Sequence, residues 1–274
     1  MSGALMPRPT RRPRTAVVLD REQLAPNLLR LRLRADDLQS EEVAFTDSYV
    51  KFILPRPGTD LAWPFDPEQV RDSLPPEQQP VLRAYTIRAF DPETSTMTVD
   101  FVTHGDEGIA GVWAATVAPG ESVGFVGPGG AWSPTASYRH FVLAGDEAAA
   151  PAIAAAVDAL PEGTTATVFL EVDHRFAMPD PDGVTIHWLM RGDALPGDPL
   201  IDAVRSHEFP GEPTGWFVHG VAEMVRDLRR HLFVERGVPR DAVSISGYWR
   251  RGMTDEQWRA TKKEFNAQLE ADLA

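Results

Sequence analysis

The sequence predicts two domains in series, a β-rich domain and then an α/β domain. From residue 15 to residue 132, short alternating or apolar segments are separated by turn-forming residues, which is typical of an antiparallel barrel or sandwich. From residue 140 onwards, apolar strands alternate with helical segments, which favours a parallel, doubly wound sheet. The chain has 274 residues, of which 43% are hydrophobic, so it can form a core in each domain. We place the boundary at residues 133–138.

The first domain contains a series of short candidate strands. The clearest is the second, where leucine and arginine alternate strictly, as expected for a strand with one face in water. Residues 55–80 hold many prolines and acids, so we expect a long surface loop there. The candidate strands are residues 15–19, 29–34, 49–54, 82–90, 96–103 and 121–126.

The second domain has a different rhythm, in which short apolar strands lead into longer helical segments. The first of its helices is rich in alanine and the last is rich in charged residues. The candidate strands are residues 140–145, 165–172, 185–189, 215–220 and 242–248, and the candidate helices are residues 148–160, 221–236 and 254–272.

The start of the chain differs from both domains. Residues 1–14 are basic and rich in proline, and they lack an apolar stretch of signal-peptide length, so we expect a disordered tail. The chain therefore divides into this tail, a β domain at residues 15–134, and an α/β domain at residues 135–274 that ends in the charged helix.

Composition excludes several classes of function. The net charge of -13 argues against nucleic acid as a partner. No apolar stretch approaches the roughly 20 residues of a membrane span, so we expect a cytoplasmic protein. We also expect a monomer. The chain has no cysteine, which excludes disulfides, cysteine-ligated iron–sulfur clusters and a catalytic thiol. Its seven histidines show no metal-ligand spacing, so we predict no metal site. Any redox chemistry needs a bound organic cofactor.

The most informative segment is residues 83–88, Arg-Ala-Tyr-Thr-Ile-Arg. Strand alternation sends Arg83, Tyr85 and Ile87 to one side, and Thr86 and Arg88 to the other. A ring for stacking, a hydroxyl and guanidinium groups suit a flat, phosphorylated, redox-active ligand such as a flavin dinucleotide. Taken alone, two arginines on a strand are more commonly surface charges.

Two following segments support a phosphorylated ligand. The first, residues 100–105, is Asp-Phe-Val-Thr-His-Gly on the next candidate strand. The second, residues 108–114, opens a short helix with small residues in its first turn, which lets phosphates approach backbone N–H groups. The candidates they add are Asp100, Phe101, Val102, His104, Gly108, Ala110, Gly111 and Trp113.

Together these segments identify a resemblance to a known family. The patterns Arg-x-Tyr-Thr-x-Arg, Asp-Phe-Val-x-His-Gly and Gly-x-Ala-x-x-Trp-Ala resemble those of the siderophore-interacting proteins, FAD-containing ferric-siderophore reductases of the ferredoxin-reductase superfamily. The similarity continues at residues 127–130, 144–153 and 247–252, and covers about residues 14–253. It implies a six-stranded antiparallel β-barrel for FAD, followed by a Rossmann-like α/β nucleotide domain with a C-terminal helix.

The resemblance also implies roles for the first set of residues. Tyr85 would stack along the isoalloxazine ring, and Thr86 would hydrogen-bond its N5 edge. Arg83 and Arg88 would serve the phosphates and the ring edge. The backbone at Val102 and at His104 would contact the ring or the ribityl chain, and the turn at residues 108–111 would hold the pyrophosphate.

The second domain lacks the Gly-x-Gly-x-x-Gly of a dinucleotide clamp. Its first strand is followed by Asp146 and Glu147, which would repel a pyrophosphate, so we expect transient binding of NADH or NADPH instead. Glu171 and Asp173, at the end of the second strand, can bond a ribose 2′-hydroxyl and favour NADH, whereas Arg175 can favour NADPH. Ordinary polar residues at strand ends are the alternative.

An anionic iron chelate needs a basic patch on so acidic a protein. The resemblance implies Lys51 and Arg250 or Arg251 as siderophore-binding residues. The family loop that often reads Gly-Pro-Arg-Gly is Gly-Pro-Gly-Gly here, because position 129 is glycine. The patch is therefore expected to be less positive than in the family.

The function expected from these residues is reduction of ferric siderophores. Electrons would pass from NAD(P)H, or from ferredoxin as a protein partner, through FAD to Fe(III), and Fe(II) would be released. Electron transfer needs no catalytic acid or base, so only binding residues are nominated. Two alternatives stay open: a generic flavin reductase or electron-transfer component of an oxygenase, and a non-catalytic siderophore-binding protein.

Overall fold

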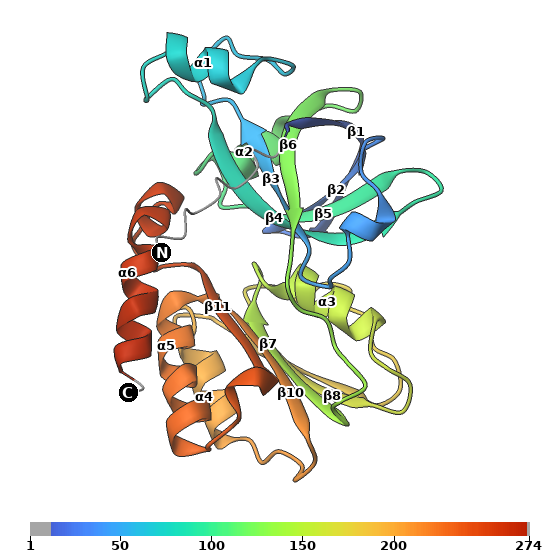
Figure 1. Cartoon of the computed structure of the whole chain (residues 1–274), viewed down its shortest axis with the longest axis vertical. Helices are drawn as coiled ribbons and strands as arrows, with labels where there is room; N and C mark the ends of the chain where they lie inside the picture. The colour runs from blue at the N-terminus through green and yellow to red at the C-terminus, as the bar shows by residue number, and fades with distance from the viewer. Residues whose placement is uncertain (1–11, 273–274) are drawn as a thin grey trace, which may run out of the picture.

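The computed structural model describes residues 12–272, and it contains the two domains that the sequence predicts (Figure 1). The first is a closed barrel with the strand order β1-β2-β5-β4-β3-β6, in which every neighbouring pair is antiparallel. The predicted fold class is confirmed. The barrel strands are β1 (Arg14–Ala25), β2 (Leu28–Arg34), β3 (Tyr49–Leu54), β4 (Val81–Asp91), β5 (Thr96–Val102) and β6 (Ser122–Gly129).

Alternation in β2 shows why these residues close a barrel. Leu29, Leu31 and Leu33 point into the barrel and are buried. Each such side chain contributes about 1.5–3 kcal/mol when fully buried. The intervening Arg30 and Arg32 point outward and pair with acids of the neighbouring strands. The alternating pattern therefore fixes which face of β2 meets the core.

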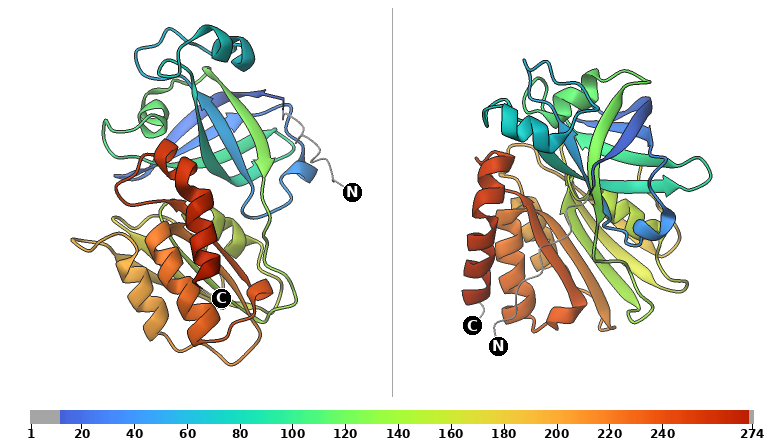
Figure 2. Two further views of the ribbon diagram at one scale, coloured as in Figure 1. Left: turned by 60° about the vertical axis from the view of Figure 1, so that its left-hand side comes forward. Right: turned by 45° about the horizontal axis from the view of Figure 1, so that its top comes forward.

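The second domain is a parallel five-stranded sheet with the order β11-β10-β7-β8-β9. Helices α4, α5 and α6 lie on one side of this sheet, and α3 lies on the other side, toward the barrel (Figures 1 and 2). The strands are β7 (His140–Asp146), β8 (Thr165–Val172), β9 (Val184–Met190), β10 (Thr214–Val221) and β11 (Val243–Trp249). The helices are α3 (Ala150–Asp158), α4 (Asp198–Ser206), α5 (Ala222–Arg230) and α6 (Asp255–Ala271).

Several expectations need correction. The expected loop at 55–80 contains helix α1 (Pro67–Ser73), which begins at Asp66, whose carboxylate accepts hydrogen bonds from two backbone N–H groups, with proline at the first helical position. Helix α4 was not expected. The predicted helix 221–236 ends as a π-helix at His231–Glu235. Arg14, assigned to the tail, is the first residue of β1, and the rest of the predicted tail lies mainly outside the described residues.

Helix α6 connects the two domains (Figure 2). Its side chains Trp258, Phe265 and Leu269 are buried against the α/β domain. Near its start, Asp255 and Glu256 pair with an arginine of β4, so the helix also contacts the barrel. Among the described residues, no helix has the length and apolar character needed to cross a membrane.

We expect Trp258→Ala to destabilise the α/β domain by about 3–5 kcal/mol, because it leaves a cavity under α6. Trp258 is 2% exposed and packs edge-on against Phe265, with ring centroids 5.2 Å apart. Thermal unfolding followed by far-UV circular dichroism measures the change. Lys263→Ala, at an exposed position of the same helix, is the control and should shift stability by less than about 0.5 kcal/mol. Equal effects of the two variants would show that α6 does not stabilise the domain.

Candidate functional site

The ladder between β4 and β5 is incomplete at the predicted ligand-binding segment. The two strands pair from Ile87 and Val99 to Asp91 and Thr96. Earlier in β4, residues 81–86 pair with β3, and no ladder to β5 is present among the described residues. Backbone groups along this part of β4 therefore face an open edge, which a ligand can use.

Tyr85 and Thr86 lie on opposite faces at this open edge, as alternation predicts. The Tyr85 ring packs on the core side, 4.2 Å from the ring centroid of Phe101 and 6.1 Å from that of Phe52. Burial raises the pKa of Tyr85 above its usual value, so its hydroxyl stays neutral. Thr86 is on the outer face and is 8% exposed, and no other described residue hydrogen-bonds to its hydroxyl. A flat ring across this edge can contact both side chains.

The two arginines of the segment have acidic partners. Arg88 pairs with Asp158, at the end of α3, at 2.7 Å, which joins the barrel to the α/β domain. Arg83 pairs with Asp255 at 3.2 Å and with Glu256 at 2.6 Å. To bind phosphate, either guanidinium would have to exchange a carboxylate for it.

The segment at residues 100–105 has a mixed role. Asp100 accepts two hydrogen bonds from Arg30, at 2.7 and 2.8 Å, and these bonds raise the pKa of Arg30. Asp100 therefore braces β2 against β5 rather than facing a ligand. Phe101 belongs to the barrel core, Val102 ends β5, and His104 is exposed.

The turn before helix α2 (Ala110–Thr116) approaches the end of β5 closely. A side chain at Gly111 would place its first carbon 3.2 Å from the carbonyl oxygen of Val102, so glycine permits this approach. Gly108 has a φ of +80°, which glycine adopts without strain. Trp113 packs within 6 Å of the rings of Phe52 and Phe101 and anchors the helix to the barrel.

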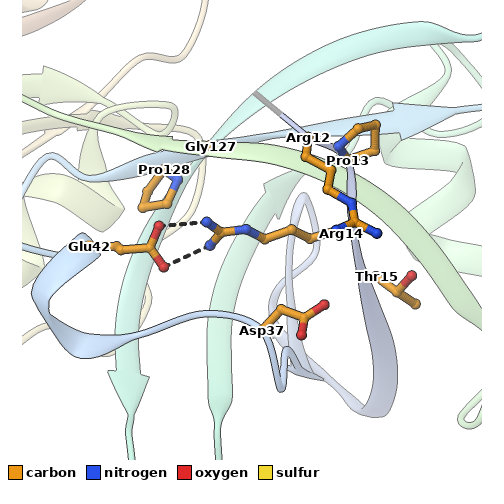
Figure 3. A pocket seen from close by; sticks show the side chains of 8 residues that line it. All are labelled: Arg12, Pro13, Arg14, Thr15, Asp37, Glu42, Gly127 and Pro128. Atoms are coloured by element: carbon orange, nitrogen blue, oxygen red, sulfur yellow. Dashed lines mark hydrogen bonds and ion pairs between the residues drawn. The ribbon is translucent and has the colours of Figure 1, made fainter. Parts of the chain in front are cut away.

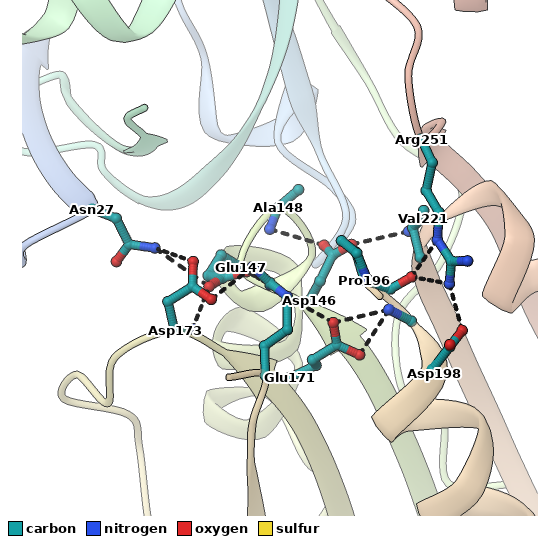
Figure 4. Close-up of polar contacts among 12 residues, drawn as sticks. Asn27, Asp146, Glu147, Ala148, Glu171, Asp173, Pro196, Asp198, Val221 and Arg251 are labelled. Carbon is teal, nitrogen blue, oxygen red and sulfur yellow. Dashed lines mark hydrogen bonds and ion pairs between the residues drawn. The ribbon is translucent and has the colours of Figure 1, made fainter. Parts of the chain in front are cut away.

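A cluster of acids lies at the carboxyl edge of the parallel sheet (Figure 4). It is organised by Arg191, which follows β9 and pairs with Glu171 at 2.8 Å, with Asp173 at 2.9 Å and with Glu147. Glu171 is fully buried and also accepts the Gly197 N–H at 2.9 Å. We call these four charged residues the Arg191 cluster.

Electrostatics in the Arg191 cluster favour the charged form of Arg191. Burial lowers the pKa of Arg191, but hydrogen bonds and charges from Glu171, Glu147 and Asp173 outweigh it and raise the pKa. Arg191 is not among the residues that the sequence predicted for this site. The available signal was that three acids follow neighbouring strands whose carboxyl ends meet at one edge, where a cation is needed to offset burial.

Asp146 cross-braces the same edge (Figure 4). Its carboxylate accepts the Val221 N–H at 2.9 Å, the Trp249 indole N–H at 2.7 Å and the Ala148 N–H at 3.0 Å. Burial raises the pKa of Asp146 to about 6, despite these hydrogen bonds. The side chain links β7, β10 and β11 and offers little surface to a ligand.

The three nicotinamide candidates are thus brought together, but their carboxylates are engaged within the protein. Asp146 and Glu147 are almost fully buried, and both oxygens of Glu171 are hydrogen-bonded. In this arrangement Glu171 cannot reach a ribose hydroxyl. Arg175 lies 5.9 Å from the ring centroid of Trp188.

The siderophore candidates are not all brought together. Lys51 lies on the outer face of β3, opposite Ala84 of β4, with its ammonium 5.9 Å from the ring centroid of Tyr49. Arg250 instead pairs with Glu223 at 3.4 Å, on the α/β domain. Arg251 pairs with Asp198 at 2.6 Å and donates to a backbone carbonyl of the same loop.

Position 129, where the family loop often has arginine, is a glycine packed against a neighbouring ring. A side chain at Gly129 would start 2.9 Å from the ring of Tyr49, so this ring takes the space that the side chain would use.

A hollow of about 740 Å³ lies beside the loop at residues 127–130, lined by Arg12, Arg14, Thr15, Asp37, Glu42 and Pro128 among others (Figure 3). Arg14 and Glu42 close a two-bond ion pair in it, at 2.6 and 2.8 Å. This hollow contains none of the predicted site residues.

A closed antiparallel barrel followed by a parallel α/β domain is the fold of ferredoxin reductases. Residues 17–132 match the family described as Siderophore-interacting FAD-binding domain, and residues 138–252 match that described as Siderophore-interacting protein. The chain therefore belongs to the siderophore-interacting protein family, which confirms the resemblance.

Three relatives illustrate this membership. An uncharacterised protein of Mycobacterium tuberculosis is 38% identical over 93% of this chain and 95% of its own. Ferric vibriobactin reductase ViuB of Vibrio cholerae is 30% identical over 90% of this chain and 92% of its own. The crystal structure of the siderophore-interacting protein SipS of Aeromonas hydrophila superposes with a TM-score of 0.75 and 29% identity, over 94% of this chain and 100% of that one.

We expect Arg191→Gln to destabilise the protein by about 3–5 kcal/mol, because it leaves buried carboxylates without a cation. Urea unfolding at neutral pH measures the loss. Arg205→Gln is the control: Arg205 pairs with Glu235 at 2.9 Å on the surface, and its loss should cost less than about 1 kcal/mol. If Arg191→Gln behaves like this control, the cluster does not brace the sheet edge.

Proposed function

We propose that this protein is an FAD-dependent ferric-siderophore reductase. Electrons pass from NADH or NADPH, or from reduced ferredoxin, through FAD to the Fe(III) of a bound siderophore. Iron(II) binds hard oxygen ligands less tightly than iron(III), so reduction releases the metal. The observation that carries the proposal is the open edge of β4 beside β5, in a chain whose residues 17–132 match an FAD-binding domain.

The residues at this edge fit FAD. Tyr85 offers a neutral ring beside the open edge, and the buried Thr86 hydroxyl has no protein partner among the described residues, so it can donate to a ring nitrogen. A side chain at Gly108 would meet no atom within 4 Å, so the turn before α2 is open there, and we place the pyrophosphate beside it. Arg88 can bind a phosphate if it releases Asp158. This costs little, because the carboxylate of Asp158 is half-exposed and is hydrated by water once the ion pair is broken.

Bound FAD supplies the redox chemistry, because it accepts a hydride and can pass electrons on singly. The task of this chain is to bind and orient. Tyr85 and Thr86 fix the ring, and Lys51, on the same outer face of the β3–β4 pair as Thr86, draws an anionic chelate toward it. No side chain has to move a proton for electron transfer to iron.

The name of ViuB as a ferric vibriobactin reductase supports the same activity here. The acidic carboxyl edge of the α/β sheet favours a donor that binds transiently over a tightly held dinucleotide, because carboxylates repel a pyrophosphate. We assign the nicotinamide to this face of the α/β domain, near Asp146, Glu147 and Glu171, without a direct bond from Glu171.

An anaerobic assay tests the proposal. The purified protein should show flavin absorption near ~450 nm, which bleaches on addition of a competent donor. NADH, NADPH and reduced ferredoxin are added separately, followed by a ferric siderophore and an Fe(II)-specific chelator. A flavin-loaded protein that leaves the iron oxidised with all three donors would rule the function out.

Two outcomes of this assay identify the alternatives. Iron reduction that does not saturate with the siderophore, and proceeds equally with any soluble acceptor, indicates a generic flavin reductase or an oxygenase component. A colourless protein that binds the chelate but does not take up FAD indicates a non-catalytic binding protein.

We expect Thr86→Val to weaken FAD binding by about 2- to 12-fold, since one hydrogen bond is worth about 0.5–1.5 kcal/mol. Valine has the shape of threonine, so the strand should keep its packing. Titration of the apoprotein with FAD, followed by flavin fluorescence, measures the affinity. Thr98→Val, on the outer face of β5 within the paired part of the ladder, is the control and should bind FAD as the wild type does. Equal affinities of both variants would remove Thr86 from the site.

A further inference from the structure

The start of helix α6 lies against the strand that carries the proposed flavin site. Arg259 of α6 donates a hydrogen bond to the Leu82 carbonyl of β4 at 3.0 Å. Arg83, the next residue of β4, donates to Asp255 at 3.2 Å and to Glu256 at 2.6 Å, and these acids are the first two residues of α6. A helix that is remote in sequence therefore binds both the backbone and a side chain of β4.

The Leu82 carbonyl belongs to the open edge of β4. The Ile87 N–H donates to the carbonyl of Ser48, which precedes β3, at 2.7 Å. Backbone groups along a strand point alternately to its two sides, so those of Leu82, Ala84 and Thr86 point away from β3 and into the open edge. The hydrogen bond from α6 to Leu82 therefore closes one end of that edge.

The open edge is short. Arg259 closes it at Leu82, and the ladder between β4 and β5 begins at Ile87. Residues 83–86 lie between these two points, which is a length of about 13 Å in an extended strand. This stretch contains both residues that we propose to hold the flavin ring, so α6 lies at one end of the proposed ring site.

The guanidinium of Arg83 is committed to α6. Its side chain is 14% exposed and binds two carboxylates at once. One of these, Glu256, also lies 3.8 Å from Arg56, in the loop after β3. Binding a phosphate would cost Arg83 both ion pairs, whereas Arg88 would give up one carboxylate. Of the two arginines, Arg83 is therefore the less suited to a phosphate.

We propose that Arg83 is a positioning residue of the FAD site and not a phosphate ligand. Its two ion pairs hold the start of α6 against β4, and this keeps Arg259 on the Leu82 carbonyl. This inference rests on the proposed function, which places FAD at this edge. A ring that enters the edge meets α6 at one end and the ladder to β5 at the other, so its place along β4 is fixed.

Titration of the apoprotein with FAD, followed by flavin fluorescence, separates the two roles. The double variant Asp255→Asn/Glu256→Gln releases Arg83 from α6. If Arg83 positions the helix, FAD binding should weaken by about 2- to 12-fold, because the hydrogen bond that closes the edge is lost. If Arg83 is a phosphate ligand, the released guanidinium can bind the phosphates, and FAD should bind more tightly.

Single variants isolate the two steps of the proposal. Arg83→Gln should weaken FAD binding by the same factor as the double variant, and combining the two should add nothing, because both break the same contact. Arg259→Gln removes the hydrogen bond to Leu82 but leaves both ion pairs of Arg83, and should give a similar loss.

A spectroscopic measurement separates positioning of the ring from a general loss of stability. The visible circular dichroism of bound FAD, recorded at saturation, responds to the groups around the ring, so it should change in Arg83→Gln and in Arg259→Gln. Glu264→Gln removes a carboxylate from an exposed position of α6 and should match the wild type in affinity and spectrum. Should the double variant fail to fold, Glu256→Gln alone replaces it in the titration.

Unchanged or tighter binding of FAD by the double variant would overturn the positioning role. A wild-type spectrum in both Arg83→Gln and Arg259→Gln would overturn it as well. These measurements need neither a donor nor a siderophore. FAD binding that depends on α6, in a protein that reduces no iron with any donor, would therefore overturn the reductase function alone.

Discussion

The buried carboxylates at the carboxyl edge of the parallel sheet are the constraint on which the α/β domain depends. Glu171 and Asp146 lie where water cannot reach them, so each must be satisfied by protein groups. Arg191 and the Gly197 N–H meet Glu171, and three N–H donors meet Asp146. Because these donors come from β10, from β11 and from the loops after β7 and β9, satisfying the acids also fixes the strand ends relative to one another.

This internal use of the sheet edge determines where a ligand can bind. In many α/β folds the carboxyl edge takes a pyrophosphate at a glycine-rich turn. Here the corresponding turn carries Asp146 and Glu147, which are committed to the brace. The edge that we propose for FAD lies elsewhere, where β4 has no β5 partner and Arg88 pairs with Asp158 of α3.

Most of the fold could be predicted from the sequence because burial of apolar side chains leaves local, periodic patterns in it. Examples are the alternation in β2, the apolar runs in β7 and β8, and the charged helix α6. Short elements such as α4 escaped because tertiary packing, not a strong sequence signal, stabilises them. Only part of the candidate site could be predicted from the sequence. Tyr85 and Thr86 follow from one strand, whereas Arg191 pairs with acids that are distant in sequence, which no local pattern reveals. For the same reason, the motif that indicated Arg250 as a binding residue did not predict its ion pair with Glu223.

Helix α6 has a consequence for how the protein is assembled. Arg83 and Asp255 are 172 residues apart, and the Leu82 carbonyl accepts a hydrogen bond from Arg259 across 177 residues. Such distant contacts form late, because a long loop must close before they contribute. The barrel and the sheet can each complete their own ladders earlier during synthesis, and the Arg88–Asp158 pair can already join them, but the contacts made by α6 are added only once that helix has left the ribosome and docked on both.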